Sequence, residues 1–336
     1  MRFSPTSTGL VAATISFLAF GTSGALLKPL LEAGWSPVAA VTVRALIAGT
    51  VLLPFVLVSL RGRWNALWRA RWRVVGMGVV GVAITQVLYF AAIQRIPVAT
   101  ALLIEFLAPL LLVGFAWAST RRTPGPAVLV GSVLAAVGLV LVIGPGAIQA
   151  VDPVGLLVAF GAAIGCAVYF VIAARPSDGL PPVALAGAGL LLAVPVLALV
   201  GVSGLLPFTT SFGDLPLFGS ATPWWVPLVI VAVIGTALAY AAGITASGLL
   251  GSRVASFVGL LEVVSASPFA WLLLGEELTP LQFLGGALIL GGIAAVRVER
   301  SEPAQGSPSV LAEPSAMVSS STVVGSSSLD PYSSRS

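Results

Sequence analysis

Ten long apolar runs follow one another along the chain, and short polar segments separate them. Each run has about the 20 residues that an α-helix needs to cross the hydrocarbon core of a bilayer. A β-barrel would instead show alternating segments of about ten residues, and the sequence has none. The pattern therefore predicts ten transmembrane helices. They fall near residues 9–31, 37–60, 74–94, 97–118, 124–144, 153–174, 181–203, 223–247, 252–274 and 279–298.

Polar residues at the starts of several runs indicate where the helices begin. A Ser, Thr or Asp followed by a proline is typical of a helix N-terminus, since the side chain caps the first turn and proline suits its first position. Thr279 and Gln282 also have the spacing of a capping box. The pairs are Ser36-Pro37, Thr123-Pro124, Asp152-Pro153, Thr222-Pro223 and Thr279-Pro280.

The composition supports a membrane protein and excludes several kinds of chemistry. Of the 336 residues, 58% are hydrophobic and 8% are charged, whereas roughly a quarter of the residues of a soluble protein are charged. We therefore predict an all-α polytopic membrane protein. Cys166 is the only cysteine and histidine is absent. These counts exclude an intramolecular disulfide, a Cys-rich metal site and histidine-based catalysis.

The basic residues predict how the helices are oriented, because short cytoplasmic loops carry an excess of Lys and Arg. With the N-terminus inside, the outer loops hold only Lys28 and Arg95. Both termini are therefore predicted to be cytoplasmic. In this orientation the cytoplasmic segments hold Arg2, Arg61, Arg63, Arg69, Arg71, Arg73, Arg121, Arg122, Arg175, Arg253, Arg297 and Arg300.

The basic loop RGRWNALWRARWR, 61–73, has an aromatic stripe. Trp64, Trp68 and Trp72 recur every four residues and share one face of a short helix, while arginines take the other faces. This pattern is typical of an interfacial helix that anchors in an anionic leaflet. We expect lipid contact here and no nucleic-acid binding.

Two halves of the chain resemble each other when the sequence is shifted by 154 residues. The shift aligns Gly81 with Gly235, Trp117 with Trp271, Gly131 with Gly285 and Gly138 with Gly292. Each half has five spans, and an odd number makes the second half enter the membrane from the opposite face. We predict inverted repeats over 1–148 and 149–300, an arrangement found in secondary transporters, followed by a disordered Ser/Pro-rich cytoplasmic tail, 301–336.

Two long segments carry a resemblance to a known family. YFAAIQRIPVATALLIEFLAPLLLVGFAW (89–117) and GSRVASFVGLLEVVSASPFAWLLLGEELTPLQFLGGALILGGIAAV (251–296) are similar to the two halves of an EamA-type member of the drug/metabolite transporter superfamily. The resemblance covers about residues 9–298. IPVATALLIEFLAPL also resembles the branch that contains threonine/homoserine exporters. The family's Leu-Glu-Pro reads Leu261-Glu262-Val263 here, and Arg121-Arg122 replaces the Gly-Glu of the first half. The resemblance implies export of a small metabolite whose identity it does not give.

Three charged residues lie well inside predicted spans: Arg44, Glu105 and Glu262. Intramembrane charges are costly and usually face a cavity or a partner. Arg44 and Glu105 have similar depths, roughly 10–12 Å below the outer boundary at 1.5 Å per residue. Arg44 could bind an anionic group of a substrate while Glu105 takes a cationic group or a proton. A plain Arg44–Glu105 ion pair that joins two helices is the alternative.

Glu262 has a related position in the second half. The 154-residue shift places Glu105 on Gly259, three residues before Glu262, so the two acids share a helical face. Such a pair suits a pathway that binds and releases protons, whereas a buried, permanently protonated acid bonded to the backbone is the alternative.

Three further polar side chains are candidate lining of a cavity. Gln86 and Tyr89 lie three residues apart on one face of the third span, and Tyr240 is the repeat counterpart of Gln86. A tyrosine near a membrane interface can equally be an anchor. Pro109 and Pro268 fall within the fourth and ninth spans, where they can break the helices or kink them.

These observations predict a secondary transporter of the cell inner or plasma membrane. It would export a small polar metabolite such as an amino acid by alternating access, with proton coupling as an option. Its partners would be a small-molecule substrate, protons and the lipid bilayer, and both monomer and homodimer stay open. We expect no cofactor, metal or enzymatic activity. The alternatives are a non-transporting scaffold or receptor, or a lipid-handling membrane protein.

Overall fold

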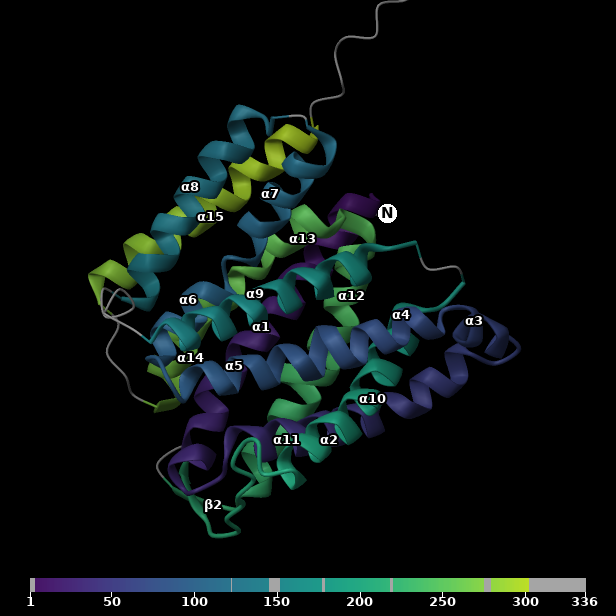
Figure 1. Cartoon of the computed structure of the whole chain (residues 1–336), viewed down its shortest axis with the longest axis vertical. Helices are drawn as coiled ribbons and strands as arrows, with labels where there is room; N and C mark the ends of the chain where they lie inside the picture. Colours follow the sequence, from purple (N-terminus) through teal and green to yellow (C-terminus); the bar gives the residue numbers. More distant parts are fainter. Residues whose placement is uncertain are drawn as a thin grey trace, which may run out of the picture. The chain divides into compact units, whose positions relative to one another are not determined.

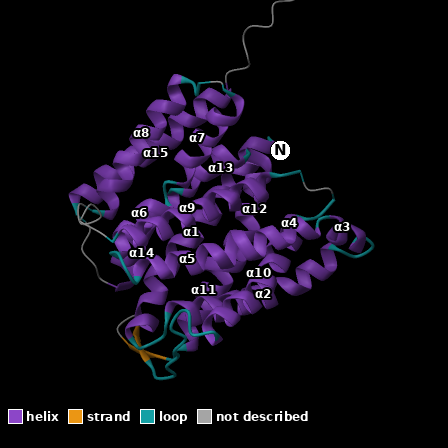
Figure 2. Cartoon of the chain, viewed as in Figure 1, coloured by secondary structure: helices purple, strands orange, loops and turns teal. Residues whose placement is uncertain are grey.

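The computed structural model describes residues 4–121, 123–144, 152–176, 179–217, 220–274 and 279–301. The predicted tail lies, except for Ser301, outside this part of the chain, as does Arg122. Helices make up most of the described chain (Figure 2). The α-helices are α1 (Pro5–Glu32), α2 (Pro37–Ser59), α3 (Trp64–Arg69), α4 (Arg71–Val75), α5 (Thr85–Ile93), α6 (Val98–Glu105), α7 (Ala108–Thr120), α8 (Pro126–Ile143), α9 (Pro153–Ala174), α10 (Pro182–Val202), α11 (Trp225–Ala232), α12 (Ala239–Leu250), α13 (Ser252–Gly259), α14 (Leu261–Leu274) and α15 (Pro280–Ser301).

All ten predicted spans are confirmed as helices that are long and apolar enough to cross a membrane. Six of them are single α-helices. The third span consists of α4, the π-helix η1 (Gly76–Ile84) and α5, and the eighth consists of α11, the π-helix η3 (Val233–Leu238) and α12. The fourth span is divided into α6 and α7, and the ninth into α13 and α14.

Three of the predicted helix caps are confirmed. The Ser36 hydroxyl accepts a hydrogen bond from the Ala39 amide at 3.3 Å, and the Asp152 carboxylate accepts one from the Val154 amide at 3.2 Å. The capping box is formed in both directions. The Gln282 amide donates to the Thr279 hydroxyl at 3.3 Å, and the Thr279 amide donates to the Gln282 side-chain oxygen at 2.9 Å. These side chains satisfy amides that have no partner in the first turn.

Two of the predicted caps are wrong. Helix α8 begins at Pro126 with Gly125 as its cap, because Pro126 rather than Pro124 takes the first helical position. Thr222 does not begin a helix, because it pairs with Leu215 in an antiparallel hairpin.

That hairpin was not predicted from the sequence. It consists of β1 (Leu215–Leu217) and β2 (Ser220–Thr222), in the connection between α10 and α11 (Figure 2). The connection is attached to the turn between α1 and α2. The Ser36 amide donates to the Thr209 carbonyl at 2.9 Å, and the Thr209 amide donates to the Ser36 hydroxyl at 3.0 Å. The Trp35 ring also stacks on Trp224 with centroids 5.5 Å apart.

Helices from the two halves of the chain pack against each other in pairs. The most extensive pairings are α8 with α15, α2 with α10, α1 with α12, α1 with α14 and α5 with α9. The α8–α15 and α2–α10 pairs lie at opposite ends of the view in Figure 1. Each pairing joins an element of residues 1–148 to one of residues 149–300, so most of the interhelical contact lies between the halves.

The basic loop forms the short helices α3 and α4 instead of one helix. Trp64, Trp68 and Trp72 are 53%, 71% and 72% exposed. The Arg71 guanidinium carbon lies 5.1 Å from the ring centroid of Trp68 and 5.7 Å from that of Trp72. This arrangement of exposed indoles and a cation is compatible with the predicted interfacial anchor.

Candidate functional site

The fourth span is interrupted directly after Glu105. Helix α6 ends at Glu105 and α7 begins at Ala108. Pro109 explains part of this break. It has no amide hydrogen, so it cannot donate to the Glu105 carbonyl four residues earlier. At the break the Leu107 amide bonds instead to the Ile104 carbonyl at 3.1 Å. The sequence therefore places an acidic side chain at an irregular part of a membrane span, which occurs where backbone lines a cavity or is covered by protein.

The ninth span is interrupted at the equivalent position. Helix α13 ends at Gly259, which the 154-residue shift aligns with Glu105, and α14 begins at Leu261. Glu262 therefore lies in the first turn of α14. The exposed amides of a helix N-terminus favour a negative charge there. Glu105 lies at the C-terminus of its helix, where the dipole disfavours a carboxylate. The two acids thus occupy opposite helix ends at matching breaks.

Arg44 lies on α2 and faces Glu262 rather than Glu105. Its charge interacts electrostatically with Tyr240 and Glu262. Within the described residues, Arg44 forms no ion pair, and its buried Nε has no hydrogen-bond partner. The direct Arg44–Glu105 pair considered from the sequence is therefore not formed. Equal depth in two spans could not identify the partner, because depth says nothing of which helices face each other.

Glu105 and Glu262 nevertheless lie close enough to interact electrostatically. Tyr89 on α5 interacts with both of them. The structure thus brings together Arg44, Glu105, Glu262, Tyr89 and Tyr240, which we call the charged cluster. Its members come from five of the ten spans, two in the second half of the chain. Opposite charges in one cluster can hold a zwitterion by both ends.

The three charged side chains of the cluster are half-buried rather than fully enclosed. Part of the surface of each side chain is therefore not covered by protein, although the residues lie in the middle of spans. Gln86 and Tyr89 on α5 are also half-buried. Burying a charge without a partner is costly, so remaining access to water or a ligand is physically reasonable here.

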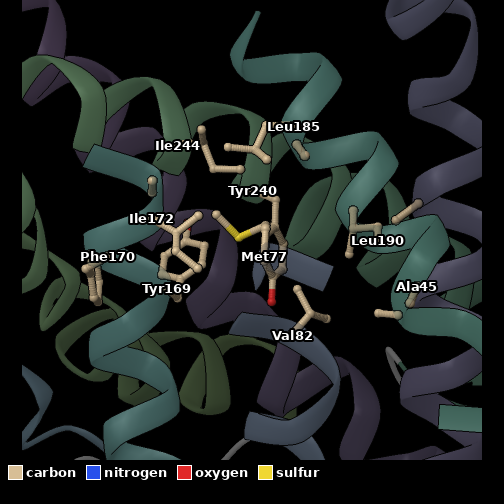
Figure 3. Packing of buried hydrophobic residues seen from close by; sticks show 14 of the residues in the cluster. Ala45, Met77, Val82, Tyr169, Phe170, Ile172, Leu185, Leu190, Tyr240 and Ile244 are labelled. Carbon is tan, nitrogen blue, oxygen red and sulfur yellow. The ribbon is translucent and has the colours of Figure 1, made fainter. Parts of the chain in front are cut away.

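Helix α9 supplies two residues that the sequence did not identify. Cys166 interacts electrostatically with both glutamates, and Tyr169 interacts with Tyr240, Cys166 and Glu262. The rings of Tyr169 and Tyr240 are 5.7 Å apart and nearly perpendicular. Figure 3 shows these two rings close together within the buried core. Neither residue is charged or has a motif around it, so the only available signal was a polar group inside an apolar run.

The two π-helical segments flank this cluster in related places. Gly81 and Gly235, which the repeat aligns, lie in η1 and η3. The Thr85 hydroxyl donates to the Val80 carbonyl at 2.8 Å, and the Thr236 hydroxyl donates to the Val231 carbonyl at 3.0 Å. Both bonds satisfy a carbonyl five residues back. π-Helical turns occur frequently at functional sites, so the third and eighth spans share a feature that periodicity did not predict.

The structure places the paired tryptophans outside the cluster. Trp117 is 54% exposed and Trp271 is 52% exposed, as expected of residues at a lipid or interface surface. Within the described residues there is no group of three or more His, Cys, Asp or Glu side chains that could hold a metal ion.

Comparison with known proteins identifies the family. The model of the EamA-like transporter family matches this chain twice, over residues 7–144 and 153–298. The chain belongs to the EamA-like transporter family. It is accordingly a multi-pass membrane transporter of the cell inner or plasma membrane and not an enzyme.

Several curated proteins are similar over most of their length. The uncharacterized inner membrane transporter YicL of Salmonella typhimurium is 26% identical, covering 88% of this chain and 96% of YicL. The threonine/homoserine exporter RhtA of Escherichia coli K12 is 27% identical, and the match covers 90% of this chain and 96% of RhtA. The uncharacterized transporter YwfM of Bacillus subtilis is 27% identical, and the match covers 82% of this chain and 89% of YwfM.

Solved protein structures include a chain with the same fold. It superposes with a TM-score of 0.64, covers 87% of this chain and 97% of its own, and is 20% identical.

Proposed function

We propose that this transporter exports a small zwitterionic metabolite, with polar amino acids such as threonine as the favoured class. The observation that carries the proposal is the charged cluster. Arg44 can bind a carboxylate, since a guanidinium offers several donors in a planar fork. Glu105 or Glu262 can bind an ammonium group. The similarity to an exporter of threonine and homoserine supports the same class.

The arrangement of the helices supports alternating access. The two halves are proposed to be inverted repeats, with the N-terminus cytoplasmic. Matching breaks in the fourth and ninth spans and matching π-helices in the third and eighth spans support this symmetry. Transporters with inverted repeats exchange the two states of a midplane site by moving one repeat against the other. The cluster draws residues from both halves, so such a movement would change its access.

Proton coupling is proposed at the two glutamates. Like charges that lie close together favour sharing a proton between them. Export would then exchange protons for the substrate, with the ammonium group displacing a proton from the pair.

The proposal is tested with purified protein in liposomes. Uptake of labelled threonine is compared with that of valine, aspartate and lysine, in the presence and absence of an opposing proton gradient. We expect threonine to move fastest and its rate to depend on the gradient. Arg44→Gln should abolish the preference for zwitterions, while Arg61→Gln, an exposed arginine at the start of the basic loop, serves as a charge-matched control. If no amino acid moves under any gradient, the proposed substrate class is wrong.

A further inference from the structure

A polar seam leads away from the charged cluster along one face of α12. Tyr240, Gly243 and Ser247 follow each other at helical spacing, so they share a face. Ser247 is fully buried and Tyr240 is 7% exposed. Helix α12 packs against α1, α9 and α10, and at Gly243 this face meets α1 and α9. A membrane helix commonly packs through such a face, so the seam requires further observations before it indicates a path.

The first observation is a close approach of three helices at Gly243. A Cβ atom at this position would lie 2.7 Å from the Ser16 hydroxyl oxygen of α1 and 2.9 Å from the Tyr169 hydroxyl of α9. The Ser16 hydroxyl donates to the Ala239 carbonyl at 2.7 Å. Two hydroxyl groups from other helices therefore meet α12 at its glycine, immediately beyond Tyr240 of the charged cluster.

The second observation is that two hydroxyls of the seam have no partner. The Tyr169 hydroxyl and the Ser247 hydroxyl are buried, and neither forms a hydrogen bond with any of the described residues. A buried polar group without a partner costs free energy, and in a native protein it calls for an explanation such as water or a ligand. The Tyr169 hydroxyl lies at Gly243 and Ser247 is one turn further along α12, so one chain of polar contacts can satisfy both groups.

The third observation is a cavity where the seam ends. Leu250, about one turn after Ser247, lines a cavity of about 470 Å³ together with Gly251, Ser252 and Arg253. Leu112 of α7 and Val296 of α15 form its other side. From Tyr240 to Leu250 the seam covers about 15 Å at 1.5 Å per residue. It thus joins the charged cluster to a cavity at the end where α12 turns into α13.

We propose that the seam between α1, α9 and α12 is the half of the transport path that joins the charged cluster to this cavity. The Tyr169 and Ser247 hydroxyls contact the polar substrate as it passes, and the seam is closed in the conformation described. The proposal rests on the proposed function in taking the charged cluster as the substrate site. It adds the route and two residues that bind substrate along it.

The test measures access to a cysteine in the seam. Ser247→Cys is reacted in sealed vesicles of each orientation with a small, positively charged, membrane-impermeant methanethiosulfonate, and mass spectrometry of peptides separates it from Cys166. Ser252→Cys, which lines the cavity, shows which vesicle face the cavity opens to. Val128→Cys is the matched control, because Val128 is 1% exposed and lies near an end of α8.

We expect Ser247→Cys to react from the same face as Ser252→Cys and about tenfold faster than Val128→Cys, since a path opens more often than a packed interface. Threonine should slow this reaction. Reaction no faster than Val128→Cys, or only from the opposite face, would overturn the proposed route. The comparison of labelling rates without threonine does not depend on which substrate the protein carries, so its failure is separate from a failure of the proposed function.

Tyr169→Phe tests the contact with substrate. It removes one hydroxyl and keeps the ring that packs against Tyr240. We expect threonine transport to fall several-fold at unchanged yield of folded protein, and the loss to be smaller for valine, which has no hydroxyl. If wild-type protein moves threonine and Tyr169→Phe moves it at the same rate with the same preference, Tyr169 does not contact the substrate.

Discussion

Arg44 on α2 interacts with Glu262 on α14, and the two residues come from different halves of the chain. The interaction links the second span to the break in the ninth. Arg44 has no ion pair within the described residues, and its Nε has no partner there. Arg44 and Glu262 therefore interact without direct contact between their charged groups. A group that lies between them can therefore bind both, and this is the basis of the first two predictions.

Glu262→Gln should reduce the rate of substrate transport about 10- to 100-fold, since hydrogen bonds to charged groups contribute about 1.5–3 kcal/mol. The side chain keeps its shape and loses its charge. Initial rates in liposomes over a range of substrate concentrations measure the effect. Glu32→Gln at the exposed end of α1 is the control and should transport as the wild type does. Equal transport rates for both variants would show that Glu262 does not take part in substrate binding.

Exchanging the charges of Arg44 and Glu262 separates folding from transport. Each single reversal puts two like charges together in the middle of the membrane and should lower the yield of folded protein. The double variant Arg44→Glu with Glu262→Arg restores opposite charges and should recover the yield, measured by size-exclusion chromatography in detergent. Transport should stay lost, because the substrate's carboxylate and ammonium groups then meet the wrong charges. Recovery of transport would show that the pair is only structural.

Close backbone contact holds α8 against α15. A Cβ atom at Gly138 would lie 2.6 Å from the Gly285 carbonyl oxygen, and one at Gly131 would lie 2.7 Å from that of Gly292. Gly138→Ala must push the helices apart, and overpacking of this kind costs about 1–3 kcal/mol. We expect a lower midpoint of thermal unfolding. Gly114→Ala on α7 has no atom within 4 Å of the added Cβ, and it should leave the midpoint unchanged or slightly raised. Equal midpoints would contradict the close packing.

Arg73 caps the C-terminus of α9. Its guanidinium donates to the carbonyls of Ile172 at 3.1 Å, Ala173 at 3.2 Å and Pro176 at 2.9 Å. A cation at a helix C-terminus satisfies free carbonyls and interacts favourably with the helix dipole. Arg73→Gln should therefore destabilise the protein by about 1–3 kcal/mol. Thermal unfolding compared with Arg61→Gln checks this, and a loss no larger than that of Arg61→Gln would show that the cap contributes nothing measurable.

The Arg95–Asp152 ion pair predicts a weak dependence of stability on pH. The Arg95 guanidinium donates to the Asp152 carboxylate at 3.2 Å and, with the Val154 amide, lowers the pKa of Asp152. Because the folded state favours the charged form, its contribution is present above the unfolded pKa of about 3.9 and is lost as pH falls through the folded pKa. The effect is small, since the pair is exposed and screened.

Asp152→Asn should lower the thermal midpoint slightly at neutral pH, and the difference should vanish in acid. Midpoints of the two proteins measured across the acidic range test the sign. A difference that grows as pH falls would contradict it. Glu32→Gln, an exposed acid at the far end of α1, controls for the general effect of removing one negative charge.

The sequence predicted those features that depend on neighbours along the chain. Runs of apolar residues determine the ten spans, since each span must satisfy its backbone internally in lipid. Local side chains determine the caps at Ser36, Asp152 and Thr279. The glycines that join α8 and α15 are visible in the sequence as a repeat, since the 154-residue shift aligns Gly131 with Gly285 and Gly138 with Gly292. The cap predicted at Thr123 is wrong because a second proline, Pro126, takes the first helical position. The cap predicted at Thr222 is wrong because Thr222 belongs to a hairpin, which depends on residues outside the Thr-Pro pair.

Three charges inside apolar runs were enough to select Arg44, Glu105 and Glu262, because such residues are costly in a membrane and rarely occur without a role. Their mutual arrangement was not predictable. Only the tertiary structure put Arg44 opposite Glu262, added Cys166 and Tyr169 from α9, and left the hydroxyls of Tyr169 and Ser247 without partners among the described residues. In lipid the hydrophobic effect contributes little to the association of helices, so the packing of small residues and polar contacts determine which helices are neighbours. Those contacts join residues distant in sequence, and the pattern along one helix does not contain them.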